Sequence, residues 1–267
     1  MIYKKIQVAL VLFLVSFLAV EPSFSQRTKS SLSSGNQRRS EKGLKDSKYF
    51  FFFINPSVSN NRVEEEVTIF TEALRRDLIA RIFYMKFAFD ISFEEIKKSQ
   101  TLLIELYRKV LIREINDSRN VLNEAAAEVL QSEDYMSKKY LALGYRSSKF
   151  AEKVMLMADN LPEKNFSVRL YEYVRAMKNV KMAKRYAVAA LVEKRIPPDK
   201  KQRINYQDYD RVKQLIEEYV QDKKERYLTL HMDNYYKVIG EKSMYDIIMD
   251  DPGLENIPEY EQYRKEK

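Results

Sequence analysis

Few side chains in this sequence could carry out chemistry. There is no cysteine, which excludes thiol catalysis and thiolate zinc sites. The single histidine, His231, has no second imidazole with which to share a proton or a metal ion. The five glycines are isolated, so no glycine-rich phosphate loop exists, and neither a G-x-S-x-G nor an S-x-x-K nucleophile motif occurs. We therefore expect no metal and no cofactor.

Carboxylates are the remaining candidates for catalysis. Glu94, Glu95, Glu105 and Glu114 follow one predicted helix, and a pair of acids can hydrolyse a glycoside. Lysine and arginine side chains are interleaved with them, as on a solvated helix face that is stabilised by ion pairs. We favour the ion-paired face over a hydrolase site, and we expect a protein that is not an enzyme.

Tyrosine is unusually common, with 19 residues, and many of these have arginine or lysine neighbours. Tyr and Arg are enriched at the centres of protein interfaces, where a large ring buries surface and keeps a polar tip. Tyr206 and Tyr209 follow Pro197-Pro198 in a polar linker, so we expect them to be the most exposed. The candidate interface residues are Phe51, Phe52, Tyr171, Tyr173, Tyr186, Arg203, Tyr206, Tyr209, Tyr235 and Tyr236.

Residues 1–25 have the layout of a cleaved secretory signal. Two lysines precede an apolar run from Ile6 to Val20, and Ser23-Phe24-Ser25 supplies small residues before the cleavage point. An uncleaved anchor is the alternative, but the run is shorter than the roughly 20 apolar residues that span a bilayer. We expect an exported protein with no other membrane span and no nucleic-acid partner. Cleavage removes Lys4, Lys5 and Glu21 and changes the net charge from +8 to +7, which permits an acidic partner.

The segment that follows, residues 26–61, has two parts. Residues 26–48 are rich in Ser, Lys and Arg and predict a disordered basic arm. Residues 49–54 (YFFFFI) then form an aromatic strap that is too apolar to remain in water. We favour packing of this strap on the protein's own helices, and insertion into a partner is the alternative.

From residue 62 to residue 253 the apolar spacing predicts helices. The first ends near Phe89-Asp90. Ser92 and Glu95 form a capping box that begins the second, which meets no Gly or Pro before Gly144. This helix should have about 39 residues and a length of about 58 Å. One compact core cannot cover such a rod, so we expect it to project as an arm or to pair with a neighbour.

Helical hairpins are predicted for residues 132–198. Ser132 or Asp134 should begin a short helix that stops at Gly144. Two pairs of alanines with a spacing of seven follow, and prolines come after each pair, which resembles a tetratricopeptide repeat. Irregular helix packing is the alternative. The two pairs are Ala151 with Ala158 and Ala183 with Ala190.

One more long helix should begin at Asp208 or Asp210 and end at Gly240, and Ser243 should cap a short last helix. Residues 254–267 form a polar tail. Together these elements predict an all-α fold: an elongated array of long helices with helical hairpins, either rod-like or V-shaped.

Four short stretches of the central region resemble the flagellar-coiling proteins of Leptospira, and the B-type more than the A-type. They are residues 140–146 (YLALGYR), 157–160 (MADN), 169–174 (RLYEYV) and 183–187 (AKRYA). The overall layout is also similar, with a signal peptide, a polar arm, long helices and no cysteine.

This resemblance implies a non-enzymatic component of the periplasmic flagellar sheath. Such a protein contacts the filament core and sheath proteins and a partner coiling protein, and it promotes filament curvature and motility. Self-association in a lattice would fit that role. A periplasmic or secreted helical module that binds peptides or host molecules is the alternative.

Overall fold

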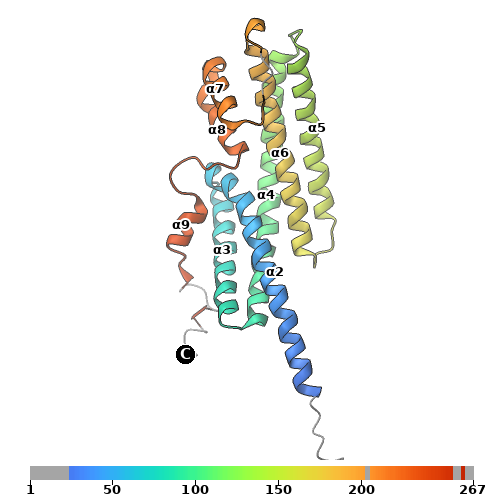
Figure 1. Ribbon diagram of the computed structural model, residues 1–267, viewed down its shortest axis with the longest axis vertical. Coiled ribbons are helices and arrows are strands. Elements are labelled where there is room, and N and C mark those ends of the chain that lie inside the picture. Colours follow the sequence, from blue (N-terminus) through green and yellow to red (C-terminus); the bar gives the residue numbers. More distant parts are fainter. Residues whose placement is uncertain (1–23, 202–204, 255–259, 262–267) are drawn as a thin grey trace, which may run out of the picture.

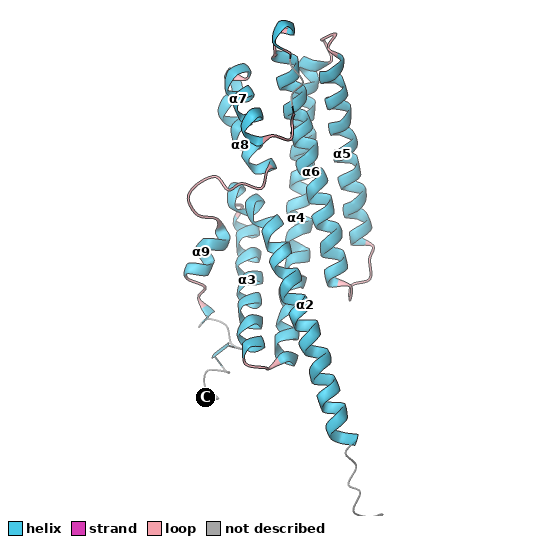
Figure 2. Cartoon of the chain, in the orientation of Figure 1, coloured by secondary structure: helices cyan, strands magenta, loops and turns pink. Residues whose placement is uncertain are grey.

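The computed structural model describes residues 24–201, 205–254 and 260–261, and these form an elongated helical bundle with no strand among them (Figures 1 and 2). The predicted all-α fold is therefore confirmed. The signal peptide prediction, Arg203 and most of the polar tail lie outside the described residues. The helices are α2 (Phe24–Asn61), α3 (Glu64–Met85), α4 (Phe89–Val129), α5 (Tyr135–Asp159), α6 (Phe166–Arg195), α7 (Tyr209–Tyr219), α8 (Lys224–Asn234) and α9 (Met244–Asp250), with 3-10 turns at Pro198–Lys200 and Gln221–Lys223.

Helix α2 occupies the segment for which we expected a disordered arm and an extended strap. Its composition favours disorder, but small residues on one face let it approach α4 closely. The Ser40 hydroxyl donates a hydrogen bond of 3.0 Å to the Phe89 carbonyl, and Gly43 lies against Ile96. Tertiary packing of this face, which local composition does not reveal, stabilises the helix.

Helix α4 is the centre of the bundle, with 41 residues in contact with α2, α3, α5 and α6 (Figure 1). The predicted length is confirmed, and so is pairing with neighbours; the projecting arm is not observed. The helix begins at Phe89, not at the predicted capping box. Ser92 is buried within the helix and donates to the Ala80 carbonyl at 2.9 Å, which ties α4 to α3.

Helices α5 and α6 form an antiparallel hairpin that packs along most of α4 (Figure 1). The Asp134 carboxylate accepts from the Met136 and Ser137 backbone N–H groups, so the predicted cap is confirmed. The predicted stop at Gly144 is wrong, because α5 continues to Asp159. Gly144 is a crossing point instead: an added Cβ would overlap the Leu122 side chain and lie 3.3 Å from the Ala183 carbonyl oxygen.

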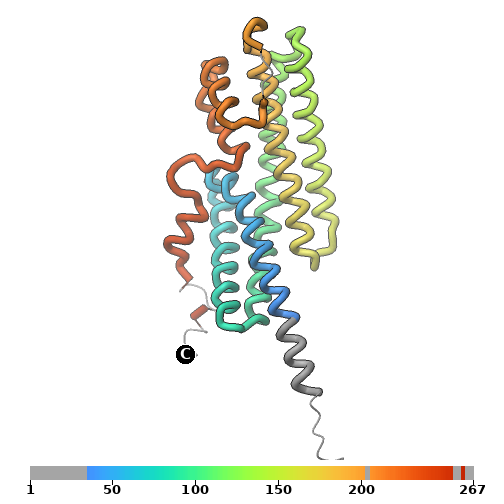
Figure 3. The backbone as a smooth tube through the Cα atoms, in the orientation of Figure 1, coloured from blue at the N-terminus to red at the C-terminus, as the bar shows by residue number. Residues whose placement is uncertain are grey.

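The C-terminal region folds back on the bundle (Figure 3). The predicted long helix from Asp208 to Gly240 is divided into α7 and α8 at Val220, which is buried. The break lets both short helices place apolar side chains in one core beside α6. Asp208 caps α7, and Ser243 forms a full capping box at α9, as the sequence predicts.

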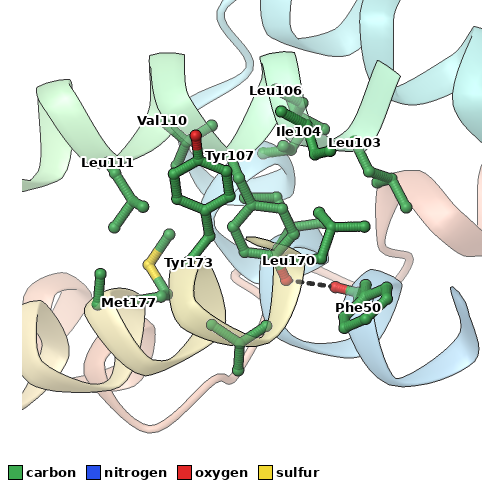
Figure 4. Close-up of a cluster of buried hydrophobic side chains, with 14 of the residues drawn as sticks. Phe50, Leu103, Ile104, Leu106, Tyr107, Val110, Leu111, Leu170, Tyr173 and Met177 are labelled. Atoms are coloured by element: carbon green, nitrogen blue, oxygen red, sulfur yellow. Dashed lines mark hydrogen bonds between the residues drawn. The ribbon is translucent and has the colours of Figure 1, made fainter. Parts of the chain in front are cut away.

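Two large hydrophobic cores follow each other along the bundle, and a small third cluster joins Ile79 and Phe83 of α3 to Ala88, Leu254 and Tyr260. The first large core joins α2, α3, α4, the second half of α5, the first half of α6 and Ile248 of α9. At its centre the Tyr107 hydroxyl donates to the Phe50 carbonyl at 2.6 Å, and the Tyr107 and Tyr173 rings stack at 6.3 Å (Figure 4). The second core joins the other halves of α4, α5 and α6 with α7 and α8.

Candidate functional site

The residues considered for catalysis are each held by a structural partner. His231 is buried, and its Nε2 lies 2.8 Å from the Tyr209 carbonyl oxygen. Burial lowers the pKa of His231, so the ring is neutral at physiological pH. Glu94 pairs with Lys97 at 2.6 Å and Glu95 with Lys98 at 2.7 Å. Within the described ranges no group of three or more His, Asp or Glu side chains could hold a metal ion.

Glu114, in contrast, belongs to a buried ionic network between the two cores. Its carboxylate pairs with Lys184 at 2.8 Å, with Lys181 at 3.4 Å and with Arg113 at 3.1 Å. Lys181 also pairs with Asp233 of α8. These charges compensate one another, so the network joins α4, α6 and α8 and presents no converging acids.

The aromatic strap is divided between the core and the surface. Phe51 lies in the core and packs edge-on against Phe70, with ring centroids 5.5 Å apart. Phe52, the next residue of α2, is 60% exposed. Packing on the protein's own helices, the favoured prediction, is therefore correct for Phe51. Of these two residues, only Phe52 is available to a partner.

Phe52 belongs to an aromatic ridge where α2 meets α6. Its ring stacks on Tyr236 at 6.4 Å, and the Lys178 ammonium lies 4.4 Å from the centre of the Phe53 ring. Tyr171 is 42% exposed and donates a hydrogen bond of 2.8 Å to Asp46. The structure thus brings three of the predicted interface residues together on one surface. The aromatic ridge consists of Tyr49, Phe52, Phe53, Tyr171, Lys178 and Tyr236.

The other predicted interface tyrosines are structural. Tyr173 is buried in the first core and hydrogen-bonds to Asp159. Tyr206 and Tyr209, which we expected to be the most exposed, are half-buried: Tyr206 donates to Glu193, and the Tyr209 ring stacks on His231 at 4.6 Å. Tyr186 and Tyr235 are half-buried too. The Tyr186 ring packs against Tyr140, and the Tyr235 ring packs against Tyr209. The rings of Tyr209 and Tyr235 pack α7 against α8, and Arg185 of α6 lies 4.0 Å from the centre of the Tyr235 ring.

A basic groove between α5 and α6 was not predicted from the sequence. It has a volume of about 550 Å³ and is lined by Leu143, Arg146, Ser147, Lys149, Phe150, Lys153, Asn179 and Tyr186. Arg146, Lys149 and Lys153 are exposed, and no carboxylate in the described part of the chain pairs with them. The i, i+3, i+7 spacing of these three residues is a signal that could have identified the basic face.

The basic groove and the aromatic ridge lie on two sides of α6. On the groove side, the Arg175 guanidinium of α6 lies 5.3 Å from the centre of the Phe150 ring. Figure 1 shows α2, α6 and α5 side by side on the face toward the viewer. We call this surface the α2–α6–α5 face. Its exposed rings and unpaired cations suit binding to another molecule more than catalysis.

Comparison with protein families assigns almost the whole described chain to one family. Residues 34–263 match the family described as surface protein adhesin OmpL37. The chain belongs to the OmpL37 family. Neither a curated protein nor a solved structure matches the sequence.

Membership in the OmpL37 family indicates a binding role at a surface, and it agrees with the expectation of an exported, non-enzymatic protein. None of the described helices combines the length and the apolar character that crossing a membrane requires.

Proposed function

We propose that this protein is a surface adhesin that binds an acidic protein partner through the α2–α6–α5 face. The observation that carries the proposal is the set of unpaired cations in the basic groove, Arg146, Lys149 and Lys153. Unpaired surface charges steer an oppositely charged partner and fix its orientation. The family match supports a binding function at a surface.

The aromatic ridge supplies the apolar part of the proposed interface. Exposed Phe52 and Tyr171 can lose solvent contact on binding, and Tyr171 keeps a polar tip toward Asp46. The ridge and groove together resemble the usual arrangement of an interface, in which aromatic anchors lie next to a polar and charged rim. This arrangement favours a protein partner over a purely ionic polymer.

Charge reversal tests this proposal directly. The triple variant Arg146→Glu/Lys149→Glu/Lys153→Glu should bind cultured mammalian cells at least about tenfold more weakly than the parent protein. The matched control is Lys200→Glu/Arg211→Glu/Lys213→Glu, which makes the same change of charge at exposed residues near α7. Trypsin treatment of the cells should abolish binding and heparinase treatment should not. Equal binding by the two triple variants would contradict the proposed face.

The resemblance to flagellar-coiling proteins gives a second, more specific function. In that role the same face would contact filament core and sheath proteins in the periplasm, and the protein would promote filament curvature. The four matching stretches lie mostly on α5 and α6, the two helices that form the basic groove. Protease treatment of intact cells distinguishes the two roles. A surface adhesin should be cleaved, whereas a sheath protein should be protected and should co-purify with isolated flagella.

A further inference from the structure

The turn between α3 and α4 presents large apolar side chains to solvent. Met85 is 77% exposed, Phe87 is 79% exposed and Ile91 is 49% exposed. The turn lies at the lower end of the bundle in Figure 1, away from the α7 and α8 end. We call residues Met85–Ile91 the α3–α4 tip. Three large apolar side chains exposed within these seven residues need an explanation.

The backbone at Phe87 is the second unusual feature of this tip. Helix α3 ends in a Schellman motif, in which the Phe87 N–H donates to the Tyr84 carbonyl and the Ala88 N–H to the Phe83 carbonyl, both at 3.0 Å. The motif needs a left-handed residue at Phe87, where φ is +62°. Glycine or asparagine usually occupies this position, because a Cβ atom is strained there. Phe87 therefore accepts backbone strain while its ring points into solvent.

The tip and the segment of α2 that packs beside it carry more basic than acidic side chains. The N-terminal part of α2 packs against the start of α4, since Ser40 hydrogen-bonds to Phe89 and the Arg39 guanidinium lies 5.9 Å from the centre of the Phe93 ring. Residues 36–45 and 84–98 together contain seven basic and four acidic side chains. The apolar tip is thus accompanied by positive charge.

We propose that the α3–α4 tip is a wedge that inserts into the surface of an anionic lipid bilayer. Exposed Phe, Met and Ile side chains fit the boundary between headgroups and acyl chains, where basic side chains can reach lipid phosphates. A protein partner would instead need a broad complementary surface of roughly 800 Å² on each side. The tip has three strongly exposed large apolar side chains, which are too few for an interface of that size. This docking is independent of the α2–α6–α5 face.

Tryptophan fluorescence can test the insertion at a single site, because the protein has no tryptophan. The Phe87→Trp variant should shift its emission to shorter wavelength when vesicles of phosphatidylcholine with about 30% phosphatidylglycerol are added to the exported protein. Vesicles of phosphatidylcholine alone should give a smaller shift. The control is Leu130→Trp, at the opposite end of α4, where the native side chain is 64% exposed; its emission should not change.

A second variant separates docking from folding. Phe87→Asn removes the ring but keeps a residue that tolerates the left-handed conformation, so its melting temperature should not fall. Its partitioning onto the same anionic vesicles should drop by about tenfold, as expected when one large apolar side chain is no longer buried. Unchanged partitioning of Phe87→Asn would overturn the proposal. Equal emission shifts in Phe87→Trp and Leu130→Trp would also overturn it. So would an emission shift of Phe87→Trp that occurs without vesicles and accompanies self-association. The groove triple variant should partition like the control triple Lys200→Glu/Arg211→Glu/Lys213→Glu, which has the same net charge. This proposal and the proposed function can therefore fail separately.

Discussion

The Lys184 ammonium lies 2.8 Å from the Glu114 carboxylate, and both side chains are buried where α4 meets α6. Transfer of these charges from water carries a large desolvation penalty, which their mutual attraction must offset. Lys181 extends the contact to Asp233 on α8, so one set of buried charges connects the two cores. Loss of Glu114 leaves Lys184 buried without its paired anion and leaves Lys181 with Asp233 alone.

Replacement of the central carboxylate should therefore destabilise the fold strongly. We expect Glu114→Gln to lower the free energy of unfolding by roughly 3–5 kcal/mol, because Lys181 and Lys184 lose their shared anion. Urea denaturation followed by circular dichroism measures the change. The control is Glu217→Gln, which removes an exposed pair with Lys213 at 3.9 Å and should cost less than about 1 kcal/mol. Similar losses in the two variants would contradict a special role for the buried network.

The same carboxylate should make the protein sensitive to acid. Burial alone would raise the pKa of Glu114, but Lys181, Lys184 and Arg113 together hold it well below its ordinary value of 4.5. Because the folded pKa lies below the unfolded one, Glu114 contributes stability above the ordinary value, and this contribution is lost as the pH falls further. The melting temperature of the parent protein should fall more steeply between about pH 5 and pH 3 than that of Glu114→Gln. Parallel curves would show that other groups dominate.

Two glycines should respond to alanine in opposite directions. At Gly144 a methyl group meets Leu122 and the Ala183 carbonyl, so Gly144→Ala should destabilise the protein by about 1–3 kcal/mol. At Gly35, within α2, an added Cβ meets nothing within 4 Å. Gly35→Ala should stabilise by about 0.5–1 kcal/mol, because alanine loses less backbone entropy in a helix. Chemical denaturation of both variants checks the signs, and stabilisation by Gly144→Ala would refute the close helix crossing.

The left-handed backbone at Phe87 gives a further test of the structure. Phe87→Gly should raise the free energy of unfolding by about 1 kcal/mol, because it removes the Cβ strain at a position that is mostly exposed. Ile91→Gly is the matched control in the first turn of α4. It should lower stability by about 1 kcal/mol, because glycine is a poor residue inside a helix. A loss of stability in Phe87→Gly would mean that the native ring contributes packing.

The predictions that the structure confirms rest on local signals. Asp134, Asp208 and Ser243 each accept a backbone hydrogen bond at a helix start, as expected from residue type and position alone. The length of α4 also follows from local information, because its stretch contains no glycine or proline. The candidate interface was harder to predict. The polar linker around Tyr206 does not reveal that the ring packs against Tyr140, which is distant in sequence.

The sequence by itself determined that this protein is all-α, that most of its helices are long, and that its side chains offer little for catalysis. Only the tertiary structure decided that residues 24–48 are helical, that α5 continues through Gly144, and that Phe51 is buried while Phe52 is exposed. Helix propensity and capping act over a few residues and can be read along the chain. Whether a small residue ends a helix or permits a close crossing depends on the helix that packs against it, and that partner is distant in sequence.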